Sequence, residues 1–293
     1  HLFVYRGKEV LHDFFIEPGY GPEVRKKIFL YKAMPEALRP ERVFCANTLY
    51  NFLPNGARAH FDTSHLFEYA TPEALGPYSL LLYKKSGERI VEMAVARANQ
   101  MSEELWGETG ITIRAFENTY DLQGNSNGVH ESYLALRQKS TEFSELRRSL
   151  IPFLISRQFF TGSGWFHTGR DRPKFWLSPR ARFIEVLSSI GTTGSSRPIL
   201  NEKDEPEADK NLYRRLHLIT GDPLIADTAI FLRCGTMCIV LDMIEEEFWE
   251  GIPCGAGADF LKAFYAFSQD SKLRFVFDFD GKKYSAINIQ ELY

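Results

Sequence analysis

The chain has 293 residues, of which 44% are hydrophobic and 25% are charged, and its formal net charge is −3. These values are typical of an ordinary globular protein with enough apolar residues for a core. They do not suggest the basic surface that usually marks a nucleic-acid-binding protein. No stretch approaches the roughly 18 consecutive apolar residues of a membrane helix.

The N-terminal part is expected to combine short strands with one long helix. Its Pro and Gly breaks predict short strands and a short helix near 22–34. A strand is predicted at 58–62, directly after a turn signal. Residues 79–84 fit either a short strand or the lead-in to a helix. The apolar spacing from 87 to 105 predicts an amphipathic helix.

The middle of the chain predicts two strands and a helix. The strands cover 111–119 and 127–134, with a loop rich in Gly and Asn between them. A helix is predicted over 140–160. Pro152 lies inside it, and because proline lacks an N–H it should kink or divide the helix.

The C-terminal part continues the alternation of strands and helices. A strand-like pattern covers 174–187, and 188–211 gives the longest loop signal, with many Gly, Ser, Pro and acidic residues. A strand is predicted at 213–219, a long apolar helix at 223–247, and a strand followed by a turn at 273–280. This order indicates an α+β fold, although periodicity alone does not fix the pairing of the strands.

The strand at 58–62 has an unusual polar face. Arg58, His60 and Asp62 occupy every second position, so they share one face. Three polar groups there are poor core material and reasonable material for a functional site. Glu68 and Glu73 follow shortly after. Because Mg²⁺ prefers oxygen ligands beside phosphates, this density of carboxylates suits a metal–phosphate centre.

Two later strands carry further candidates. His130 and Glu131 are adjacent, so they point to opposite faces, and His130 is preferred with Glu131 in reserve. Arg215 and His217 share one face. Imidazole can ligate a metal, and guanidinium suits phosphate. No Gly-x-x-x-x-Gly-Lys loop is present, so an ATP site would not be of the P-loop kind.

Five stretches, in order, resemble the Pup ligase and Pup deamidase (depupylase) family. The first reads Asn-Gly-Ala-Arg and ends in Glu-Tyr-Ala-Thr-Pro-Glu, and the others include Val-His-Glu-Ser-Tyr and Tyr-Arg-Arg-Leu-His. The five stretches are residues 55–73, 125–133, 150–158, 196–206 and 213–222. Such agreement in order is not plausibly chance.

The resemblance implies an α+β fold of the glutamine-synthetase-like type, with a curved, mostly antiparallel sheet backed by helices. It implies one large catalytic domain over 1–293. The family's opening Gly-x-Glu-x-Glu-Tyr has no match in residues 1–54, and its small C-terminal domain is also expected to be missing from this sequence. His65 and Glu68 are one residue further apart than in the family, which indicates a divergent member.

The resemblance also implies roles for single residues. Asp62 matches the catalytic aspartate, and its carboxylate could either deprotonate an attacking amine or water or act as a nucleophile itself. Glu68 and His217 match metal-binding positions. Residues expected to bind the nucleotide are His130, Arg180, Arg197 and Arg215. Secondary candidates are Arg58, Glu73 and Glu131. The acidic run at 204–207 is expected to be a solvated loop despite its family match.

The implied function is an ATP- and Mg²⁺-dependent ligase that joins a glutamate carboxylate of a small Pup-like tag protein to a substrate lysine. The Asp62–Glu68 spacing favours this branch. One alternative is a nucleotide-dependent deamidase or depupylase, favoured by Ser-Arg-Gln at 156–158. Another is a non-catalytic binding module of the same fold. The expected partners are the tag and lysine-bearing proteins, with no nucleic acid and no membrane. Because the four cysteines complete no zinc site, we expect free thiols and a cytoplasmic location.

Overall fold

The structure is a computed structural model, and it divides into two compact units, His1–Glu117 and Asn118–Tyr293. The described residues are 2–6, 9–10, 43–45, 48–61, 67–106, 111–120, 125–137, 143–167, 173–192, 196–248, 252, 259–279 and 281–293. The helix expected near 22–34 and the catalytic candidate Asp62 lie outside them. A single catalytic domain over 1–293 stays a prediction.

The described residues of the first unit form two antiparallel sheets and one long helix. The larger sheet runs in the order β3 (Val43–Cys45), β4 (Thr48–Phe52), β5 (Arg58–Phe61), β6 (Phe67–Ala70). The smaller sheet runs in the order β2 (Glu9–Val10), β1 (Leu2–Arg6), β7 (Ile111–Ala115). The strand predicted at 58–62 is therefore confirmed.

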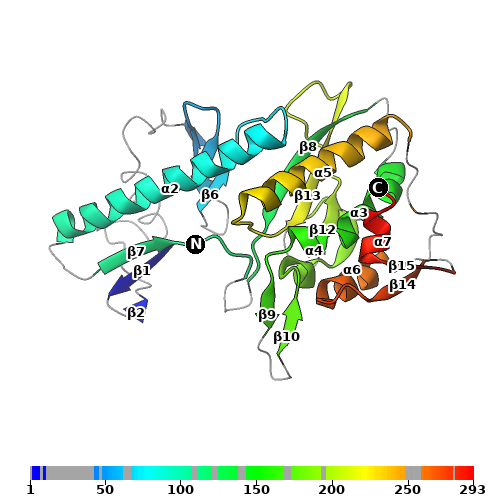
Figure 1. Ribbon diagram of the computed structural model, residues 1–293. Coiled ribbons are helices and arrows are strands. Elements are labelled where there is room, and N and C mark those ends of the chain that lie inside the picture. Colours follow the sequence, from blue (N-terminus) through cyan, green and yellow to red (C-terminus); the bar gives the residue numbers. More distant parts are fainter. Residues whose placement is uncertain are drawn as a thin grey trace. The chain divides into compact units, whose positions relative to one another are not determined.

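Helix α2 (Pro77–Trp106) is one continuous helix of 30 residues, drawn in cyan to green in Figure 1. This single helix includes both the helix predicted from 87 to 105 and the segment 79–84, for which the sequence had left strand or helix open. Proline suits a first helical position, because its fixed φ fits and no N–H is needed there. Buried Ile90, Ala94 and Ala98 recur at helical spacing and form the apolar stripe.

Two side chains explain how α2 packs on its neighbours. Asn99 bonds to both backbone groups of Ile113: its Nδ2 donates to the carbonyl at 3.1 Å, and its Oδ1 accepts from the N–H at 2.7 Å. It thereby ties the helix to β7. At Gly87, an added Cβ would lie 2.4 Å from the ring of Tyr69, so the helix needs glycine at that point.

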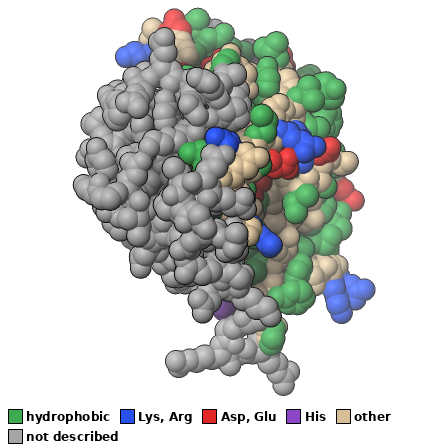
Figure 2. All heavy atoms as spheres, turned by 90° about the vertical axis from the view of Figure 1, so that its left-hand side faces the viewer, with side chains coloured by type: hydrophobic (Ala, Val, Ile, Leu, Met, Phe, Trp, Pro, Cys, Tyr) green, Lys and Arg blue, Asp and Glu red, His purple; other side chains and the backbone are tan. Residues whose placement is uncertain are grey.

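The described surface of the molecule shown in Figure 2 carries both signs of charge. Acidic and basic side chains are interspersed among apolar ones there. On α2 the two signs form local ion pairs, such as Lys84 with Glu88 at 2.5 Å and Arg89 with Glu92 at 2.7 Å. The Arg89–Glu92 pair is exposed, and exposed pairs contribute little to stability.

The second unit is organised around a four-stranded sheet. Its order is β11 (Val186–Ser189), β12 (Pro198–Asn201), β13 (Tyr213–Gly221), β8 (Val129–Leu136). Strands β11 and β12 are parallel, and the other pairs are antiparallel. In the β13–β8 pair, Arg215 lies opposite Leu134 and His217 lies opposite Ser132. This register fixes which side chains become neighbours.

The remaining elements of the second unit surround this sheet (Figure 1). The helices are α3 (Phe143–Ser156), α4 (Gln158–Thr161), η2 (Arg180–Phe183), α5 (Asp227–Glu245), α6 (Phe260–Gln269) and α7 (Ala286–Gln290). Two hairpins are β9 (Trp165–His167) with β10 (Lys174–Trp176), and β14 (Val276–Phe279) with β15 (Lys282–Ser285). The main core joins α3, β12, β13, α5 and α6 through buried Leu, Ile, Val, Met and Phe side chains.

The structure corrects three sequence expectations. The helix predicted over 140–160 runs through Pro152 and ends at Ser156, so the division lies at Arg157 instead of the proline. The segment 174–187 is interrupted by η2 and is not one strand. The long loop predicted at 188–211 contains the fully buried strand β12, which begins with a proline at its first position, where a strand tolerates it.

None of the helices in the described part of the chain combines the length and apolarity needed to cross a bilayer. The apolar helix predicted at 223–247 is confirmed as α5. It is held against the unit by buried Ile230, Met237, Val240 and Leu241.

Candidate functional site

One face of the β8–β13 pair gathers the polar side chains predicted on both strands. Arg215 and His217 lie on this face, while Leu216 and Leu218 are fully buried on the other. Nε2 of His217 and Nδ1 of His130 lie 3.3 Å apart, close enough for one imidazole to donate to the other. We call the face formed by His130, Ser132, Arg215 and His217 the open face.

Arg215 is oriented by the neighbouring strand. Its Nε donates to Oγ of Ser132 at 3.1 Å. The strand register explains this contact, because Ser132 is opposite His217 and therefore diagonal to Arg215. The guanidinium is thereby directed along the open face, beside both imidazoles.

Both histidines of the open face are neutral at pH 7. The pKa of buried His217 falls to about 4, because burial, then the charges of Arg215 and Lys203, disfavour the imidazolium. Partial loss of hydration, and then the charges of His217, Arg180 and Arg215, lower the pKa of His130 as well, although this residue is more exposed than His217. Neutral imidazoles can still donate or accept hydrogen bonds.

Nδ1 of His217 is an unusual atom. It is buried and has no hydrogen-bond partner among the described residues. A buried polar nitrogen without a partner is costly, so such atoms deserve an explanation. A bound ligand that supplies the missing partner is one explanation that fits a site.

Arg180 is buried, with only 2% of its surface exposed, and lies near enough to His130 for its charge to act on that imidazole. Its Nε donates to the carbonyl of Ile219 at 2.9 Å, and its Nη1 donates to Oγ of Ser126 at 2.9 Å. Burial and the charge of Arg197 lower its pKa to about 10, so it stays charged at neutral pH. Gly128 leaves room for it, since a Cβ there would lie 2.8 Å from Nε of Arg180.

Arg197 is more ordered than the sequence suggested. It was expected in a flexible loop, but its carbonyl accepts hydrogen bonds from the N–H groups of Glu185 at 2.9 Å and Val186 at 3.2 Å. It therefore stands at the entrance to β12, where its charge acts on Arg180. The open face and its margin thus collect several positive charges in one place.

The acidic run at 204–207 is not simply a solvated loop. Asp204 is half-buried, and its Oδ2 accepts from Nη2 of Arg137 at 2.9 Å. Lys203 and Glu205 form an exposed ion pair at 3.0 Å. The expectation of a solvated loop is therefore wrong at Asp204, because the carboxylate of this residue is half-buried and bound by Arg137.

Glu131 lies on the other side of the sheet, opposite the open face. Its carboxylate accepts from Arg157 through Nη2 at 2.7 Å and Nη1 at 3.3 Å, and from the hydroxyl of Tyr133 at 2.7 Å. Burial raises its pKa, but Arg157 and Arg233 more than offset this effect and the net pKa is lowered. His130, the preferred residue of the adjacent pair, is the one on the open face. Nothing in the sequence had identified Arg157 as the partner.

Four of the candidates, Arg58, Asp62, Glu68 and Glu73, belong to the first unit. The backbone register of β5 and β6 places Glu68 opposite His60 and Ala70 opposite Arg58. Glu68 and Glu73 are exposed, and the Arg58 guanidinium lies 6.0 Å from the ring centre of Phe52. Asp62 lies outside the described residues, so its predicted role stays a prediction.

The described residues do not fit a metal centre by themselves. Nowhere in the described ranges do three or more His, Cys, Asp or Glu side chains gather as a metal-binding group. The open face instead offers arginines and neutral imidazoles, which suit an anion better than a divalent cation. Mg²⁺ binding through Glu68 and His217 therefore stays a prediction.

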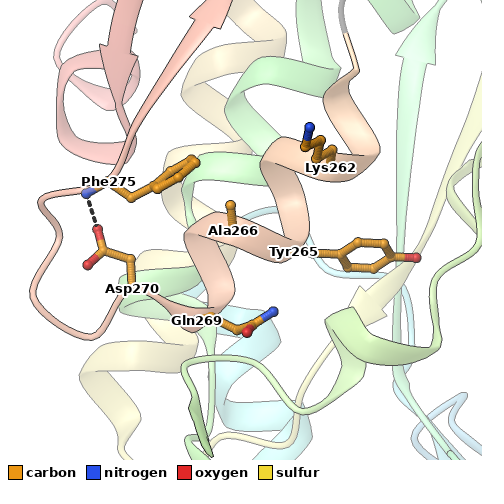
Figure 3. Close-up of a pocket in the computed structure, with 6 residues that line it drawn as sticks. All are labelled: Lys262, Tyr265, Ala266, Gln269, Asp270 and Phe275. Carbon is orange, nitrogen blue, oxygen red and sulfur yellow. Dashed lines mark hydrogen bonds between the residues drawn. The ribbon is translucent and has the colours of Figure 1, made fainter.

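A second feature, in the same unit, is an open surface pocket of about 490 Å³ beside α6 (Figure 3). It is lined by Lys262, Tyr265, Ala266, Gln269, Asp270 and Phe275. The carboxylate of Asp270 is occupied by the N–H of Phe275, and the hydroxyl of Tyr265 by the carbonyl of Ile184. No predicted site residue lines it, so the open face is the better candidate.

Comparison with known proteins settles the family. A sequence model described as Pup-ligase protein matches residues 25–293 of this chain. The chain belongs to the Pup-ligase family. The predicted resemblance is thereby confirmed, and with it the α+β fold class.

Relatives in the Pup-ligase family carry two different activities in their names. A depupylase of Acidothermus cellulolyticus is 39% identical over 269 residues, covering 89% of this chain and 50% of the relative. A Pup--protein ligase of Sanguibacter keddieii is 46% identical over 194 residues, covering 66% of this chain and 42% of the relative. The chain thus spans about half the length of the relatives it matches.

Solved structures of the ligase PafA are similar as well. The complex of PafA with Pup matches with a TM-score of 0.80 and 28% identity, covering 100% of this chain and 54% of that one. PafA in complex with ADP matches with a TM-score of 0.72 and 29% identity, covering 97% and 60%. These matches confirm the mostly antiparallel fold predicted for the family.

Proposed function

We propose that this Pup-ligase family member binds ATP and joins a glutamate carboxylate of a Pup-like tag protein to a lysine of a protein substrate. The open face carries this proposal. It presents Arg215 and two neutral histidines near buried Arg180, and one buried histidine nitrogen has no partner in the described structure. A nucleotide supplies phosphate oxygens for such a set of donors. The ADP complex of PafA, a similar structure, supports this choice of ligand.

The residues would act mainly by positioning and by electrostatics. Guanidinium groups match phosphate oxygens in geometry and stay charged. Fixed positive charge stabilises the negative charge that develops while a phosphoryl group is transferred. In the ligase reaction the tag's glutamate carboxylate takes the γ-phosphoryl group of ATP. The lysine amine then attacks the acyl phosphate, releasing phosphate and forming an isopeptide bond.

Asp62 is proposed as the base that removes a proton from the attacking amine, and Mg²⁺ as the ion that accompanies ATP. Both assignments rest on the family resemblance. The secondary candidates Arg58 and Glu73 keep their proposed supporting roles. A cytoplasmic location and the tag and lysine-bearing protein partners belong to the same proposal.

A depupylase or deamidase is the second candidate function. One observation favours it: the similarity to the depupylase of Acidothermus cellulolyticus extends over 89% of this chain. Hydrolysis of an amide needs water as the nucleophile and does not consume ATP. The two candidate functions therefore differ in the stoichiometry of nucleotide use.

The test is to incubate the purified chain with ATP, Mg²⁺, Pup and a lysine-bearing acceptor protein. Intact mass spectrometry would follow the conjugate, and a coupled assay would follow ADP. A ligase gives one ADP for each isopeptide bond. Conversion of a Pup ending in glutamine to one ending in glutamate, without net loss of ATP, would replace the ligase by the deamidase. ATP binding without either product would leave a non-catalytic binding module.

The matched variant is Asp62→Asn. Loss of a general base costs about 10²–10⁴ in rate, whereas nucleotide affinity should be retained because the change is nearly isosteric. A variant that keeps more than about half of the wild-type rate would remove Asp62 from the mechanism.

A further inference from the structure

Strand β12 pairs with only part of β13, and the N-terminal part of β13 extends beyond this pairing. The two strands pair at Leu200 with Leu218 and at Asn201 with His217. The chain then leaves the sheet, and the N–H of Glu202 donates to the carbonyl of Ser189 at 2.9 Å. The next section of β13, which carries Arg215, has β8 on one side and no strand of the described structure on the other.

A side chain takes the place of the missing strand. The N–H of Arg215 donates to Oδ1 of Asp204 at 3.2 Å, where a strand carbonyl would otherwise accept it. A backbone N–H in a half-buried strand needs such a partner. The Asp204 carboxylate therefore extends the ladder of β12 past the point at which the strand stops.

The carboxylate is itself held from the other side. Its Oδ2 accepts from Nη2 of Arg137 at 2.9 Å and lies 3.6 Å from Nε of Arg214. Arg137 also donates to the carbonyls of Lys210 at 2.8 Å and Tyr213 at 3.1 Å, so it gathers the loop and the start of β13. Asp204 has a φ of 46°, a region that Asp and Asn tolerate better than most residues.

We propose that Asp204 is a positioning residue for Arg215, holding the backbone from which the guanidinium reaches the open face. This inference rests on the proposed function in one respect, namely that Arg215 contacts a nucleotide phosphate. The geometric part, in which Asp204 orders this section of β13, is independent of that function.

Electrostatics and positioning make opposite predictions for the loss of this carboxylate. Asp204 is a negative charge near a basic face, so its removal should tighten anion binding if charge alone mattered. If Asp204 positions Arg215, its removal should weaken binding. The sign of the change therefore separates the two effects.

The experiment compares Asp204→Asn, Asp204→Gly and Glu207→Gln with the wild-type chain. Asn keeps one acceptor oxygen and tolerates the same φ, while Gly tolerates the φ and removes every acceptor. Glu207 is an exposed carboxylate of the same loop, so its variant controls for the lost charge. The readouts are hydrogen–deuterium exchange of the peptide containing Arg215 and the affinity for ATP by calorimetry.

The expected order of ATP affinity is wild type, then Asp204→Asn, then Asp204→Gly. The last should be about three- to tenfold weaker than wild type, which is the size of effect that one ordinary hydrogen bond has. Exchange at the peptide containing Arg215 should quicken in the same order, and Glu207→Gln should leave it unchanged. In an Arg215→Ala background, Asp204→Gly should cause no further loss of affinity. A general loss of structure would instead add to the effect of Arg215→Ala.

Unchanged exchange in Asp204→Gly, or ATP binding that tightens as in Glu207→Gln, would overturn the positioning role. A wild-type chain that binds no ATP would overturn the proposed function instead. In that case the exchange experiment would still decide whether Asp204 orders the strand that carries Arg215.

Discussion

The two faces of the β8–β13 pair treat charged residues in opposite ways. On the buried face, Glu131 is matched by Arg157 and by the Tyr133 hydroxyl. On the open face, Arg215 stands beside two histidines whose pKa values are lowered, in part by its own charge. The same two strands thus carry a compensated charge on one side, and an arginine beside two neutral histidines on the other.

This difference separates a structural from a functional use of polar residues. A buried charge is tolerated when its partner is built into the protein, because the protein itself replaces the lost hydration. The open face instead leaves a buried nitrogen of His217 without a partner among the described residues, which is what the proposed binding of a ligand would explain. Sequence spacing alone showed which residues share a face of the sheet. It did not show on which face a charged side chain has a partner of opposite charge.

The largest effect is expected from breaking the compensated pair. Arg157→Met should lower the free energy of unfolding by about 3–5 kcal/mol, because Glu131 would stay buried without its partner. Urea denaturation would measure the loss. The double variant Glu131→Met, Arg157→Met is the control and should regain most of it. Equal losses in the single and double variants would mean that packing, not charge, sets the stability of this face.

A smaller effect concerns Asp222, a buried carboxylate that contrasts with Glu131. Burial raises its pKa from 3.8 to about 6, although the Thr119 hydroxyl and the Arg180 N–H donate to it. Between these two pKa values, the Asp222 carboxyl therefore keeps its proton in the folded state but has released it in the unfolded state. The resulting stability is fully present below pH 4 and is lost as the pH rises through about 6.

The pH dependence can be isolated with Asp222→Asn, which does not ionise. The free energy of unfolding of this variant, minus that of wild type, should rise by up to about 3 kcal/mol between pH 4 and pH 7. Urea denaturation across this range would measure it, and the titration of the histidines cancels in the difference. A flat difference would show that Asp222 has an ordinary pKa despite its burial.

The smallest effect on stability is expected on the open face. Arg215→Ala should weaken ATP binding about tenfold, because one charge-assisted contact to phosphate is lost. The free energy of unfolding should change by less than about 0.5 kcal/mol, as for other surface substitutions. Calorimetry would measure the ATP affinity, and urea denaturation of the same preparation would measure the free energy of unfolding. A large loss of stability with unchanged affinity would place Arg215 with the structural residues.

The sequence predicted those elements of the fold whose pattern is local. The alternation over 213–219 and the apolar run over 223–247 gave β13 and α5. β12 was missed because its four buried residues lie between polar, Gly-rich segments, which dominate a window of ordinary length. The break after α3 was placed at Pro152, whereas it occurs at Arg157, whose side chain is bound to a residue distant in sequence.

For the candidate site, too, the sequence predicted local relations between residues but not contacts between distant segments. The shared face of Arg215 and His217, and the preference for His130 over Glu131, came from a period of two residues and agree with the contacts observed. The partners Arg157 and Arg137 could not be found in this way, because both contacts join segments far apart in the chain. The roles of Asp62, Glu68 and Glu73 stay predictions.

Gly128 and Arg180 have a consequence for the history of this family. A Cβ at position 128 would lie 2.8 Å from Nε of Arg180, which is fixed by the carbonyl of Ile219 and by Ser126. Position 128 cannot gain a side chain while Arg180 stays as it is, whereas position 180 can change while the glycine remains. A lineage that acquires alanine or a larger residue at 128 must first shorten or redirect the side chain at 180. Across descendants of this gene the arginine should therefore be lost before, and never after, the glycine.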